Sequence, residues 1–468
     1  MPQAYEAVVI GSGPGGYVAA IRLAQLGKKT LCIEAERLGG VCLNRGCIPS
    51  KALIAAADLY HAVGSEGKTF GISVEGRSLD FGKTQKFRER VVKKMTGGVG
   101  ALFRAWGVET LQGMAAFADP NTLTVTTADG EERIAFESAV IATGSLPFYI
   151  PGFEPDGDRV VGSRQALEFA EVPASLLVIG GGYIGLELGI AYRKFGTAVT
   201  VVEMLESLLP LSPSNLAEPV ARRCRKLGIE VHLGTAARTL EKRTDGLTLI
   251  AEVPGGEEVR LEAERVLVTI GRRPRTDELN LAAAGLETDD KGFIPVDEHR
   301  RTAAENIRAI GDVAGPPLLA HKASKEAIVA AEDIAGREAV YDPRAVPAVI
   351  FTDPEVAYVG LSEEEARAAG HEVMTGQFPY AASGRAAAIN RQEGFVKVIG
   401  EAGSGKLLGV QIVGHEAADL INEACVALEA GLSVEQLGHA MHPHPTLGEI
   451  VMEAAETALG QAVHGQLE

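Results

Sequence analysis

At 468 residues, the chain is longer than one ordinary domain, and its length predicts about three or four. With 46% hydrophobic and 23% charged residues, its composition is that of a globular protein with a large core. The net charge of −17 argues against a nucleic-acid partner, because a phosphate-binding face needs clustered Lys and Arg.

The N-terminal segment, the apolar runs and the cysteine content limit the class of protein further. The N-terminal segment lacks a basic start and is interrupted by glycines, so no secretory leader is expected. No run of about 20 uncharged apolar residues occurs, so no membrane span is expected either. Five cysteines are too few for a secreted disulfide framework. These features predict a cytoplasmic enzyme.

The first element in chain order is a strand–turn–helix–strand pattern. YEAVVI at 5–10 predicts a short buried strand, GSGPGG at 11–16 predicts a glycine-rich turn, and the apolar segment that follows predicts a helix. The next strand ends at Glu34, 23 positions after Gly11. In such a unit the glycines let a pyrophosphate approach the helix N-terminus, and the acid binds a ribose diol.

Two cysteines follow within GGVCLNRGCIPSKAL, at Cys42 and Cys47. Residues five apart in a regular helix have Cα atoms ~8.6 Å apart, whereas a disulfide needs about 4.4–6.8 Å. A bonded pair therefore requires a break in the helix, which Gly46 can supply. Pro49 suits the first turn of a new helix. Cys47 is thus expected near a helix N-terminus, where the dipole favours a thiolate.

Three interpretations of this cysteine pair are weighed. A structural disulfide that closes so short a loop stabilises little, and a reducing cytosol would disfavour it. A zinc site would want two further ligands at related spacing, which the other cysteines do not provide. Arg45 and Lys51 flank the pair and are expected to favour a thiolate. Redox use is the favoured interpretation.

A second copy of the glycine pattern follows later in the chain. SLLVI at 175–179 predicts a strand, GGGYIG at 180–185 a turn, and a helix and a further strand lead to Glu203. Two such units predict two dinucleotides, a flavin and a nicotinamide. VVEMLESLLP offers no Arg near Glu203 to accept a 2′-phosphate, so NAD is favoured over NADP.

GGVCLNRGCIPSKAL resembles the active-site segment of the flavoprotein disulfide reductases, the class I FAD-dependent pyridine nucleotide–disulfide oxidoreductases. The resemblance extends over nearly the whole chain through further motifs. These are VIATGS at 140–145, VLVTIGRRP at 266–274, AIGDVAGPPLLAHKASKEA at 309–327 and HPHPTLGE at 442–449. Within the family, the chain is most similar to members that oxidise protein-bound dihydrolipoamide with NAD+.

The resemblance implies an α/β fold with two Rossmann-like dinucleotide-binding domains and a C-terminal α+β dimerisation domain. The expected divisions are an FAD-binding domain at 1–147, an NAD-binding domain at 148–275, a central segment completing the FAD site at 276–345 and an interface domain at 346–468. Glycine- and proline-rich stretches at both ends of the inserted NAD-binding domain are typical of such crossings.

The resemblance also implies the cofactor contacts. FAD is expected at Gly11, Gly13, Gly16, Glu34, Lys51, the Ala115 backbone, Thr143, Gly144, Asp312, Ala320 and His321. NAD is expected at Gly180, Gly182, Gly185, Glu187, Glu203 and Gly271. Lys51 and Glu187 are expected to pair beside the flavin ring. No metal site is implied.

The catalytic roles follow from the same motifs. His444 matches the family base and Glu449 matches the acid that orients it. The substrate thiolate is expected to attack Cys42, while Cys47 faces the flavin. His442 would point to the side opposite His444 in an extended stretch. Family members normally bring the His–Glu pair from the other subunit of a homodimer.

The implied partner is the lipoyl domain of an acyltransferase or of the glycine cleavage carrier protein, and the sequence leaves open which complex is served. A mercuric reductase-like enzyme would need an extra C-terminal cysteine pair, and a glutathione reductase-like one an Arg for a 2′-phosphate. Two departures from the dihydrolipoamide-oxidising members make the substrate prediction less specific. Tyr183 stands where many of them have an aliphatic residue, and HPHPTLGE differs from the commoner HAHPTLSE. A non-catalytic binding paralogue is the alternative from another class, which the intact motifs oppose.

Overall fold

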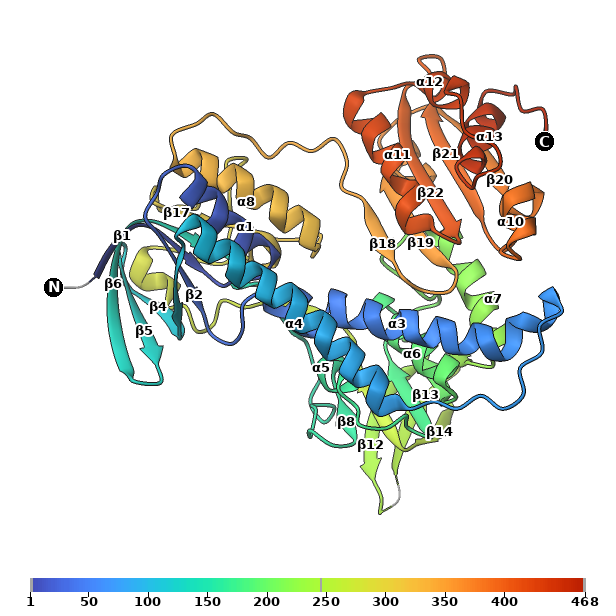
Figure 1. The fold of residues 1–468 in the computed structure, drawn as a ribbon, viewed down its shortest axis with the longest axis horizontal. Coiled ribbons are helices and arrows are strands. Elements are labelled where there is room, and N and C mark those ends of the chain that lie inside the picture. The colour runs from blue at the N-terminus through green and yellow to red at the C-terminus, as the bar shows by residue number, and fades with distance from the viewer. Residues whose placement is uncertain (1–2, 245, 466–468) are drawn as a thin grey trace. The chain divides into compact units, whose positions relative to one another are not determined.

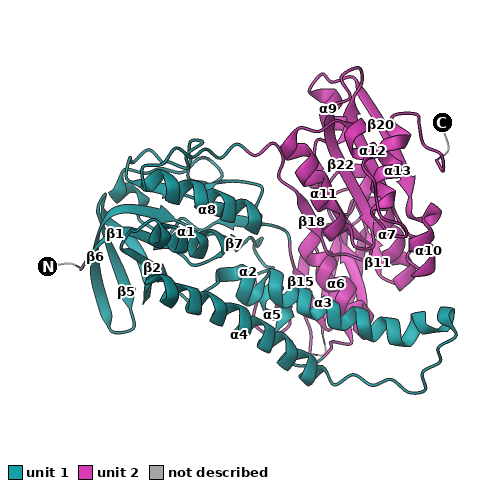
Figure 2. Cartoon of the chain, turned by 45° about the horizontal axis from the view of Figure 1, so that its top comes forward, with its two compact units in different colours: residues 1–154, 162–171, 270–342 teal, residues 155–161, 172–269, 343–468 magenta. Residues whose placement is uncertain are grey.

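The computed structural model describes residues 3–244 and 246–465, which form two compact units coloured separately in Figure 2. Unit 1 contains residues 1–154, 162–171 and 270–342, and unit 2 contains residues 155–161, 172–269 and 343–468. Each unit is therefore assembled from segments that are distant in the sequence.

The core of unit 1 is a seven-stranded sheet in the order β3-β2-β1-β6-β5-β4, with β17 paired to β6. The strands are β1 (Gln3–Ile10), β2 (Thr30–Glu34), β3 (Glu109–Gln112), β4 (Met114–Asp119), β5 (Thr122–Thr127), β6 (Gly130–Ile141) and β17 (Ile307–Ala309). β1 pairs in parallel with β2 and β6, whereas β4, β5 and β6 form an antiparallel meander. Residues 7–10 of β1 are buried on both faces, which explains the apolar run AVVI at the end of this strand.

Helices cover one face of this sheet. α1 (Pro14–Gln25), α4 (Phe81–Trp106) and α8 (Ala320–Ile334) share a core with β1, and α1 lies beside α8 in Figure 1. The opposite face packs against β4, β5 and the segment 279–294. The other helical elements of unit 1 are α2 (Gly40–Arg45), α3 (Cys47–His61), η1 (Ala62–Glu66), η2 (Gly67–Phe70), α5 (Ser163–Leu167), η4 (Leu281–Ala284) and η5 (Gly311–Ala314).

A short antiparallel ladder joins the segment 1–154 of unit 1 to its segment 270–342. It consists of β7 (Ser145–Pro147) and β16 (Arg272–Pro274), with Ser145 opposite Pro274 and Pro147 opposite Arg272. The ladder holds the chain together where it leaves unit 1 and where it returns.

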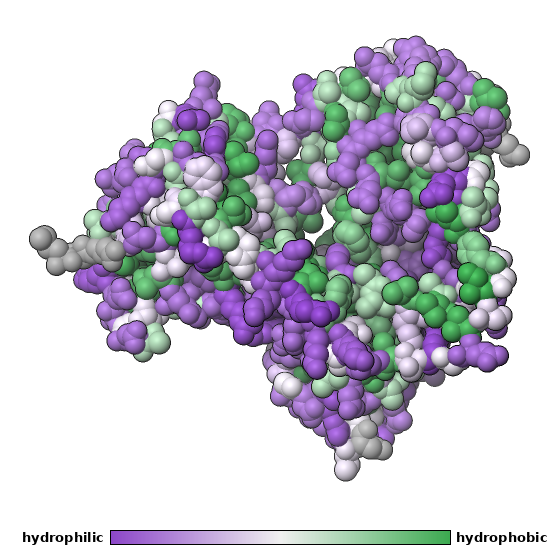
Figure 3. All heavy atoms as spheres, viewed as in Figure 1, coloured by the Kyte–Doolittle hydropathy of each residue, from purple (hydrophilic) through white to green (hydrophobic). Residues whose placement is uncertain are grey.

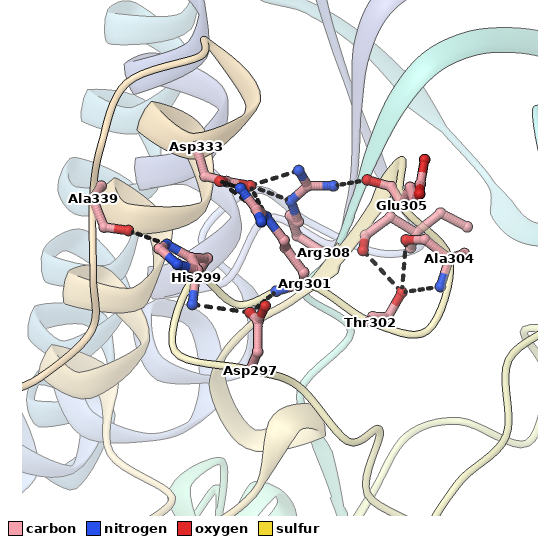
Figure 4. A network of polar contacts seen from close by, with 10 residues as sticks. Asp297, His299, Arg301, Thr302, Ala304, Glu305, Arg308, Asp333 and Ala339 are labelled. Carbon is pink, nitrogen blue, oxygen red and sulfur yellow. Dashed lines mark hydrogen bonds and ion pairs between the residues drawn. The ribbon is translucent and has the colours of Figure 1, made fainter.

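An ion cluster attaches β17 and the loop before it to α8, as Figure 4 shows. Arg308 Nε donates to Asp333 Oδ2 at 2.7 Å, and Arg301 Nη2 lies 2.5 Å from Asp333 Oδ1. His299 Nδ1 lies 2.6 Å from the Ala339 carbonyl oxygen. Burial alone would raise the pKa of Asp333, but the hydrogen bonds from both guanidinium groups lower it below its ordinary value. Asp333 is therefore a buried carboxylate held by two cations.

Unit 2 contains a five-stranded parallel sheet in the order β11-β10-β9-β15-β8. Its strands are β8 (Val160–Val161), β9 (Ser175–Ile179), β10 (Ala198–Val202), β11 (Glu230–His232) and β15 (Arg265–Val268), and its helices are α6 (Tyr183–Phe195), η3 (Ser214–Leu216) and α7 (Ala217–Leu227). A separate antiparallel sheet contains β12 (Ala236–Lys242), β13 (Leu247–Glu252) and β14 (Glu258–Ala263). Both predicted strand–turn–helix–strand units are confirmed, as β1–α1–β2 and as β9–α6–β10.

The C-terminal part of unit 2 is a five-stranded antiparallel sheet in the order β18-β19-β22-β21-β20. Its elements are β18 (Ala348–Ile350), β19 (Glu355–Gly360), α9 (Glu363–Ala368), β20 (Val373–Pro379), η6 (Tyr380–Ala382), α10 (Gly384–Ala388), β21 (Phe395–Glu401), β22 (Leu407–Gly414), α11 (Ala417–Ala430), α12 (Val434–His439) and α13 (Glu449–Ala458). α11, α12 and α13 share one apolar core with the sheet. The central strand β22 is buried at every position, and its one polar residue, Gln411, accepts a hydrogen bond from Asn215.

Asp353 links this C-terminal part to the parallel sheet of the same unit. Lys194 Nζ on α6 lies 2.7 Å from Asp353 Oδ2, and Arg223 Nη2 on α7 lies 2.8 Å from the same atom. Burial opposes ionisation, but the two cations outweigh it and lower the pKa of Asp353 to about 2. Asp353 is thus a carboxylate at all but strongly acidic pH.

The visible surface is mostly hydrophilic, with smaller hydrophobic areas (Figure 3). Exposed apolar side chains of unit 1 include Leu59, Phe70, Ile72, Phe87 and Met95, which lie on α3, α4 and the segment between them. Among the described residues, no helix combines the length and hydropathy needed to cross a membrane.

Candidate active site

The first glycine turn connects β1 to α1. Gly11 has φ +96°, and a Cβ there would lie 2.5 Å from the Ala142 carbonyl oxygen. A Cβ at Gly16 would lie 1.9 Å from the Gly11 carbonyl oxygen. Both positions therefore require glycine for the packing of the turn itself. A Cβ at Gly13, the N-cap of α1, would meet nothing within 4 Å. The open space at this helix N-terminus fits the approach of a pyrophosphate.

Glu34, the last residue of β2, is held beside this turn. Its Oε2 accepts hydrogen bonds from the Ser12 amide at 2.9 Å and from the Ser12 hydroxyl at 2.6 Å. Its Oε1 accepts one from the Glu36 amide at 2.9 Å. A carboxylate has about four acceptor sites, so capacity for a ribose diol remains. Ser12 is a contributor that the glycine pattern alone did not identify.

Cys42 and Cys47 lie together across a break between α2 and α3. The break is at Gly46, where a Cβ would lie 3.0 Å from the Val41 carbonyl oxygen. Cys47 is the first residue of α3, so the predicted helix N-terminus is confirmed. A hydrogen bond with Cys47, followed by burial, raises the pKa of Cys42 well above its ordinary value. Cys42 therefore holds its proton more tightly than an ordinary cysteine thiol does.

The two basic residues near the cysteines behave differently. Arg45 Nη2 donates to Glu36 Oε1 at 2.6 Å, and Arg45 Nη1 bonds the other oxygen. The guanidinium is thus directed to Glu36, because a bidentate pair with a carboxylate is its preferred geometry. Lys51, on α3, contributes a charge that opposes the rise in the pKa of Cys42. The charge of Lys51 thus acts on Cys42, while the expected effect of Arg45 and Lys51 on Cys47 stays a prediction.

The other expected FAD contacts of unit 1 belong to several elements. Ala115 is buried on β4, Thr143 and Gly144 precede β7, Asp312 lies on η5, and Ala320 and His321 begin α8. The Thr143 hydroxyl donates to the Arg275 carbonyl at 2.7 Å, and the Arg275 amide donates to the Gly144 carbonyl at 3.0 Å. These bonds attach the Thr143–Gly144 turn to the returning chain.

The backbone around Asp312 is fixed by a buried ion pair from α8. Glu326 has no exposed surface, and its Oε2 accepts from the Gly311 amide at 2.7 Å. Lys322 Nζ lies 3.1 Å from Glu326 Oε1 and donates to the Gly315 carbonyl at 2.8 Å. Both ends of η5 are thereby bound to α8. Lys322 and Glu326 were not predicted as part of the site, although a Lys and a Glu four apart on an apolar helix face were the available signal.

The second glycine turn repeats the first. Gly180 has φ +104°, and a Cβ at Gly185 would lie 2.5 Å from the Gly180 carbonyl oxygen. A Cβ at Gly182, the N-cap of α6, would meet nothing within 4 Å. Glu203 follows β10, and its Oε2 accepts from the Gly181 amide at 2.6 Å. This turn also fits a dinucleotide pyrophosphate with an acid at its ribose.

The remaining expected nicotinamide contacts belong to different units. Glu187 is buried on α6, and its Oε1 accepts from the Phe351 amide at 2.9 Å. Gly271 has φ +143° and immediately precedes β16 in unit 1. Lys51 belongs to unit 1 and Glu187 to unit 2, so their pairing stays a prediction.

His444 and Glu449 form the expected pair in unit 2. His444 Nδ1 lies 2.8 Å from Glu449 Oε1, and the imidazole is 79% exposed. The Thr446 amide donates to Glu449 Oε2 at 2.9 Å. Burial would raise the pKa of Glu449, but the bonds from Thr446 and His444 lower it below its ordinary value. The carboxylate can therefore fix the Nδ1–H tautomer and leave Nε2 free to take a proton.

His442 has a different environment. Its Nε2 lies 2.7 Å from Glu423 Oε1, and its Nδ1 lies 2.8 Å from the Ala440 carbonyl oxygen. The hydrogen bond with Glu423 is the largest cause that raises the pKa of His442. Its side chain is 7% exposed, so His442 is tied to α11 while His444 faces outward. The two histidines therefore bind different partners. Among the described residues, no group of three or more His, Cys, Asp or Glu side chains could hold a metal ion.

The fold and this arrangement match one family of redox proteins. The family model for the pyridine nucleotide-disulphide oxidoreductases matches residues 5–327, and the dimerisation domain of the same family matches residues 346–455. The chain therefore belongs to the pyridine nucleotide-disulphide oxidoreductase family. The resemblance and the α/β fold class predicted from the sequence are confirmed.

Individual relatives narrow the likeness within the family. The chain is 47% identical to a dihydrolipoyl dehydrogenase of Halobacterium salinarum over 98% of this chain and 97% of that protein. It is 48% identical to a dihydrolipoyl dehydrogenase of Geobacillus stearothermophilus with the same two coverages. Among solved structures, the HOCl-induced flavoprotein disulfide reductase RclA of Escherichia coli matches with a TM-score of 0.86 and 26% identity, covering 97% of this chain and 99% of that one.

Proposed function

We propose that this protein is an NAD-dependent dihydrolipoyl dehydrogenase that oxidises protein-bound dihydrolipoamide through a Cys42–Cys47 redox disulfide. The observation that carries the proposal is the meeting of these two cysteines across the break at Gly46, at the N-terminus of α3. The close relatives named dihydrolipoyl dehydrogenase support the choice of substrate, since they match nearly the whole chain.

The catalytic roles follow from the geometry of the two pairs. His444, oriented by Glu449, accepts the proton of a substrate thiol near neutral pH. The resulting thiolate attacks the Cys42 sulfur of the disulfide, and Cys47 leaves as a thiolate. The N-terminus of α3 favours that thiolate, and the Lys51 charge on the same helix is expected to act in the same direction. The second substrate sulfur then displaces Cys42, which leaves lipoamide and a reduced cysteine pair.

The two glycine turns supply the cofactor sites. FAD, when bound, takes up the electron pair of the reduced cysteines and passes it to NAD+. Glu34 and the open N-terminus at Gly13 would hold the adenosine half of FAD, and Asp312 would hold its ribityl chain. Glu203 and the open N-terminus at Gly182 would hold NAD.

The organisation of the molecule is part of the proposal. The division at 147, 275 and 345 gives an FAD-binding domain, an NAD-binding domain, a central segment and an interface domain. The match of residues 346–455 to the family's dimerisation domain supports a homodimer, in which His444 and Glu449 of one subunit serve the cysteines of the other. The lipoyl domain of an acyltransferase or glycine cleavage carrier protein would deliver the substrate. A cytoplasmic location agrees with the small number of cysteines.

The test compares Cys42→Ser, Cys47→Ser and His444→Gln by two activities and the visible spectrum. All three variants should lose dihydrolipoamide oxidation, by at least about a hundredfold. Cys42→Ser should show a long-wavelength charge-transfer band without added reductant, because Cys47 remains as a thiolate beside oxidised FAD. NADH oxidation by an artificial one-electron acceptor should be retained in His444→Gln, since that route does not use the base.

His439→Gln is the matched control. His439 is an exposed histidine just before the loop that carries His444, and its side chain contacts Gln461. It should keep both activities. A wild-type protein that folds but carries no FAD would overturn the proposal. Retained dihydrolipoamide oxidation in Cys42→Ser would overturn the order of the two sulfurs.

A glutathione reductase-like activity is the second candidate, favoured by one residue. Tyr183 begins α6 and is 42% exposed at the second glycine turn, as in relatives where a tyrosine covers the nicotinamide pocket. Turnover of glutathione disulfide with NADH or NADPH at a rate matching dihydrolipoamide would favour this candidate.

A further inference from the structure

Three residues from separate parts of unit 1 form a hydrogen-bonded chain that ends at Asp312. The Ser145 hydroxyl donates to Asp312 Oδ2 at 2.5 Å. Arg272 Nε donates to the Ser145 hydroxyl oxygen at 2.8 Å, and Arg272 Nη2 donates to the Ser145 carbonyl at 2.7 Å. Ser145 is 5% exposed. The chain joins β7, β16 and η5.

The direction of these hydrogen bonds is fixed by chemistry. A guanidinium has donors and no acceptor, so the Ser145 oxygen must accept from Arg272. The single hydroxyl proton of Ser145 is then directed to Asp312, whose carboxylate accepts it. This bond occupies Oδ2 and leaves Oδ1 as the acceptor for a ligand hydroxyl. The rotation of the Asp312 carboxylate is thereby determined by a residue that need not touch the ligand.

The backbone of Asp312 is held separately. Glu326 binds the Gly311 amide, and Lys322 binds the Gly315 carbonyl, so both ends of η5 are attached to α8. The side-chain torsions of Asp312 are the freedom that remains. Ser145 and Arg272 remove that freedom.

We infer that Ser145 and Arg272 are positioning residues for the flavin ribityl contact at Asp312. The inference rests on the proposed function, because it takes Asp312 as an FAD ligand. It also gives a role to the β7–β16 ladder, which completes the flavin site only when the chain returns to unit 1 at Arg272. FAD affinity should therefore depend on a residue that lies beyond the inserted segment 172–269.

The test measures FAD binding rather than turnover. Full-length holoprotein is diluted, the release rate is followed by the fluorescence of freed FAD, and apoprotein is titrated with FAD. Ser145→Ala should raise the dissociation constant by about 10- to 100-fold, the range for losing a hydrogen bond to a charged group. Arg272→Gln should raise it by about 3- to 10-fold, because the Ser145 hydroxyl remains but its proton is no longer directed.

Arg273→Gln is the matched control on the same strand. Arg273 is exposed and pairs with Asp277, so its replacement should leave FAD release unchanged. An Asp312→Ala background separates positioning from general support of the fold. In that background, Ser145→Ala and Arg272→Gln should change FAD affinity by less than about twofold.

The outcomes distinguish the inference from the proposed function. A wild-type protein without FAD would overturn the function and the inference together. A yellow wild-type protein whose Ser145→Ala and Arg272→Gln variants release FAD like Arg273→Gln would overturn the inference alone. Equal losses with and without Asp312 would also overturn it, because the residues would then act on the fold and not through Asp312. If Ser145→Ala does not fold, Arg272→Gln in both backgrounds decides the same question.

Discussion

The two glycine turns, one in each unit, hold their acids by the same bond but with different neighbours. In unit 1, Ser12 gives Glu34 both its amide and its hydroxyl. In unit 2, Gly181 gives Glu203 only an amide. A Cβ at Gly181 would lie 2.8 Å from Leu208 Cδ2 and 3.1 Å from Glu203 Cβ, so a serine there would require Leu208 and Glu203 to shift. The backbone amide is the shared device, and the extra hydroxyl is specific to the first site.

The two units also repeat an aspartate held by two cations. Asp333 in unit 1 binds Arg301 and Arg308, and Asp353 in unit 2 binds Lys194 and Arg223. Asp353 lies 130 positions from Arg223, whereas Asp333 lies only 25 and 32 positions from its two arginines. The comparison shows that the dinucleotide turns depend on local spacing, whereas the packing around them depends on buried charge pairs.

The largest expected effect comes from the glycines that the turns need for packing. Gly16→Ala places a Cβ 1.9 Å from the Gly11 carbonyl oxygen, which must displace backbone. It should destabilise unit 1 by more than about 3 kcal/mol and abolish FAD retention. Gly13→Ala meets no neighbour, so its apoprotein should unfold at nearly the wild-type temperature while FAD affinity falls by about tenfold. Thermal unfolding of apoprotein and FAD titration measure both effects.

Gly185→Ala and Gly182→Ala make the same contrast in unit 2, with NAD in place of FAD. A Cβ at Gly185 would clash with the Gly180 carbonyl oxygen, whereas one at Gly182 would not. Equal destabilisation by both substitutions in either turn would contradict the distinction between packing glycines and ligand-facing glycines.

Features that depend on short spacing in the sequence could be predicted, whereas contacts between residues far apart in the sequence could not. Both glycine turns, the acids 23 positions later and the helix break at Gly46 depend on spacing within about 30 residues, so they could be read directly. The Ser145–Asp312 bond joins residues 167 positions apart, and the Ser145–Arg272 bond joins residues 127 apart. Their motifs were noted, but no local pattern indicates that their side chains meet.

The partner of Arg45 could not be predicted for a similar reason. Arg45 was expected to favour a thiolate at Cys47 because it flanks the cysteines in the sequence. The fold brings Glu36 within reach of its guanidinium, and the two form a bidentate ion pair. No local pattern indicates this pair, and the effect of Arg45 on Cys47 stays a prediction.

An intermediate effect is expected at the aspartate of unit 2. The pKa of Asp353 is lowered from an ordinary value of 3.8 to about 2. A carboxyl group whose pKa is lower in the folded state stabilises the fold when the pH is above its pKa in the unfolded chain. This contribution is lost as the pH falls through the pKa of the folded state. The free energy of unfolding of the wild-type protein should exceed that of Asp353→Asn by about 2 kcal/mol at pH 6. The difference should shrink between pH 4 and pH 2, as measured by urea unfolding.

Asp333→Asn should show the same sign in unit 1, since its pKa is also lowered. Asp290→Asn, at an exposed loop position, is the control and should leave stability unchanged at every pH. A constant difference between wild type and Asp353→Asn down to pH 2 would show that packing, and not the ion pair, makes the contribution.

The smallest effect should appear in the choice of nicotinamide cofactor. Glu203 Oε1 accepts from the Leu205 amide at 2.8 Å and Oε2 from the Gly181 amide, so the carboxylate is held in place. A 2′-phosphate would bring like charge beside it, and ~1.4 kcal/mol already gives tenfold discrimination. Wild-type kcat/KM should therefore favour NAD+ over NADP+ by more than about tenfold.

Glu203→Gln keeps the shape of the side chain and removes its charge, so it should lower the ratio of kcat/KM for NAD+ to that for NADP+ by about tenfold. Glu206→Gln, an exposed neighbour, should leave it unchanged. An unchanged ratio in Glu203→Gln would show that this carboxylate does not select the cofactor.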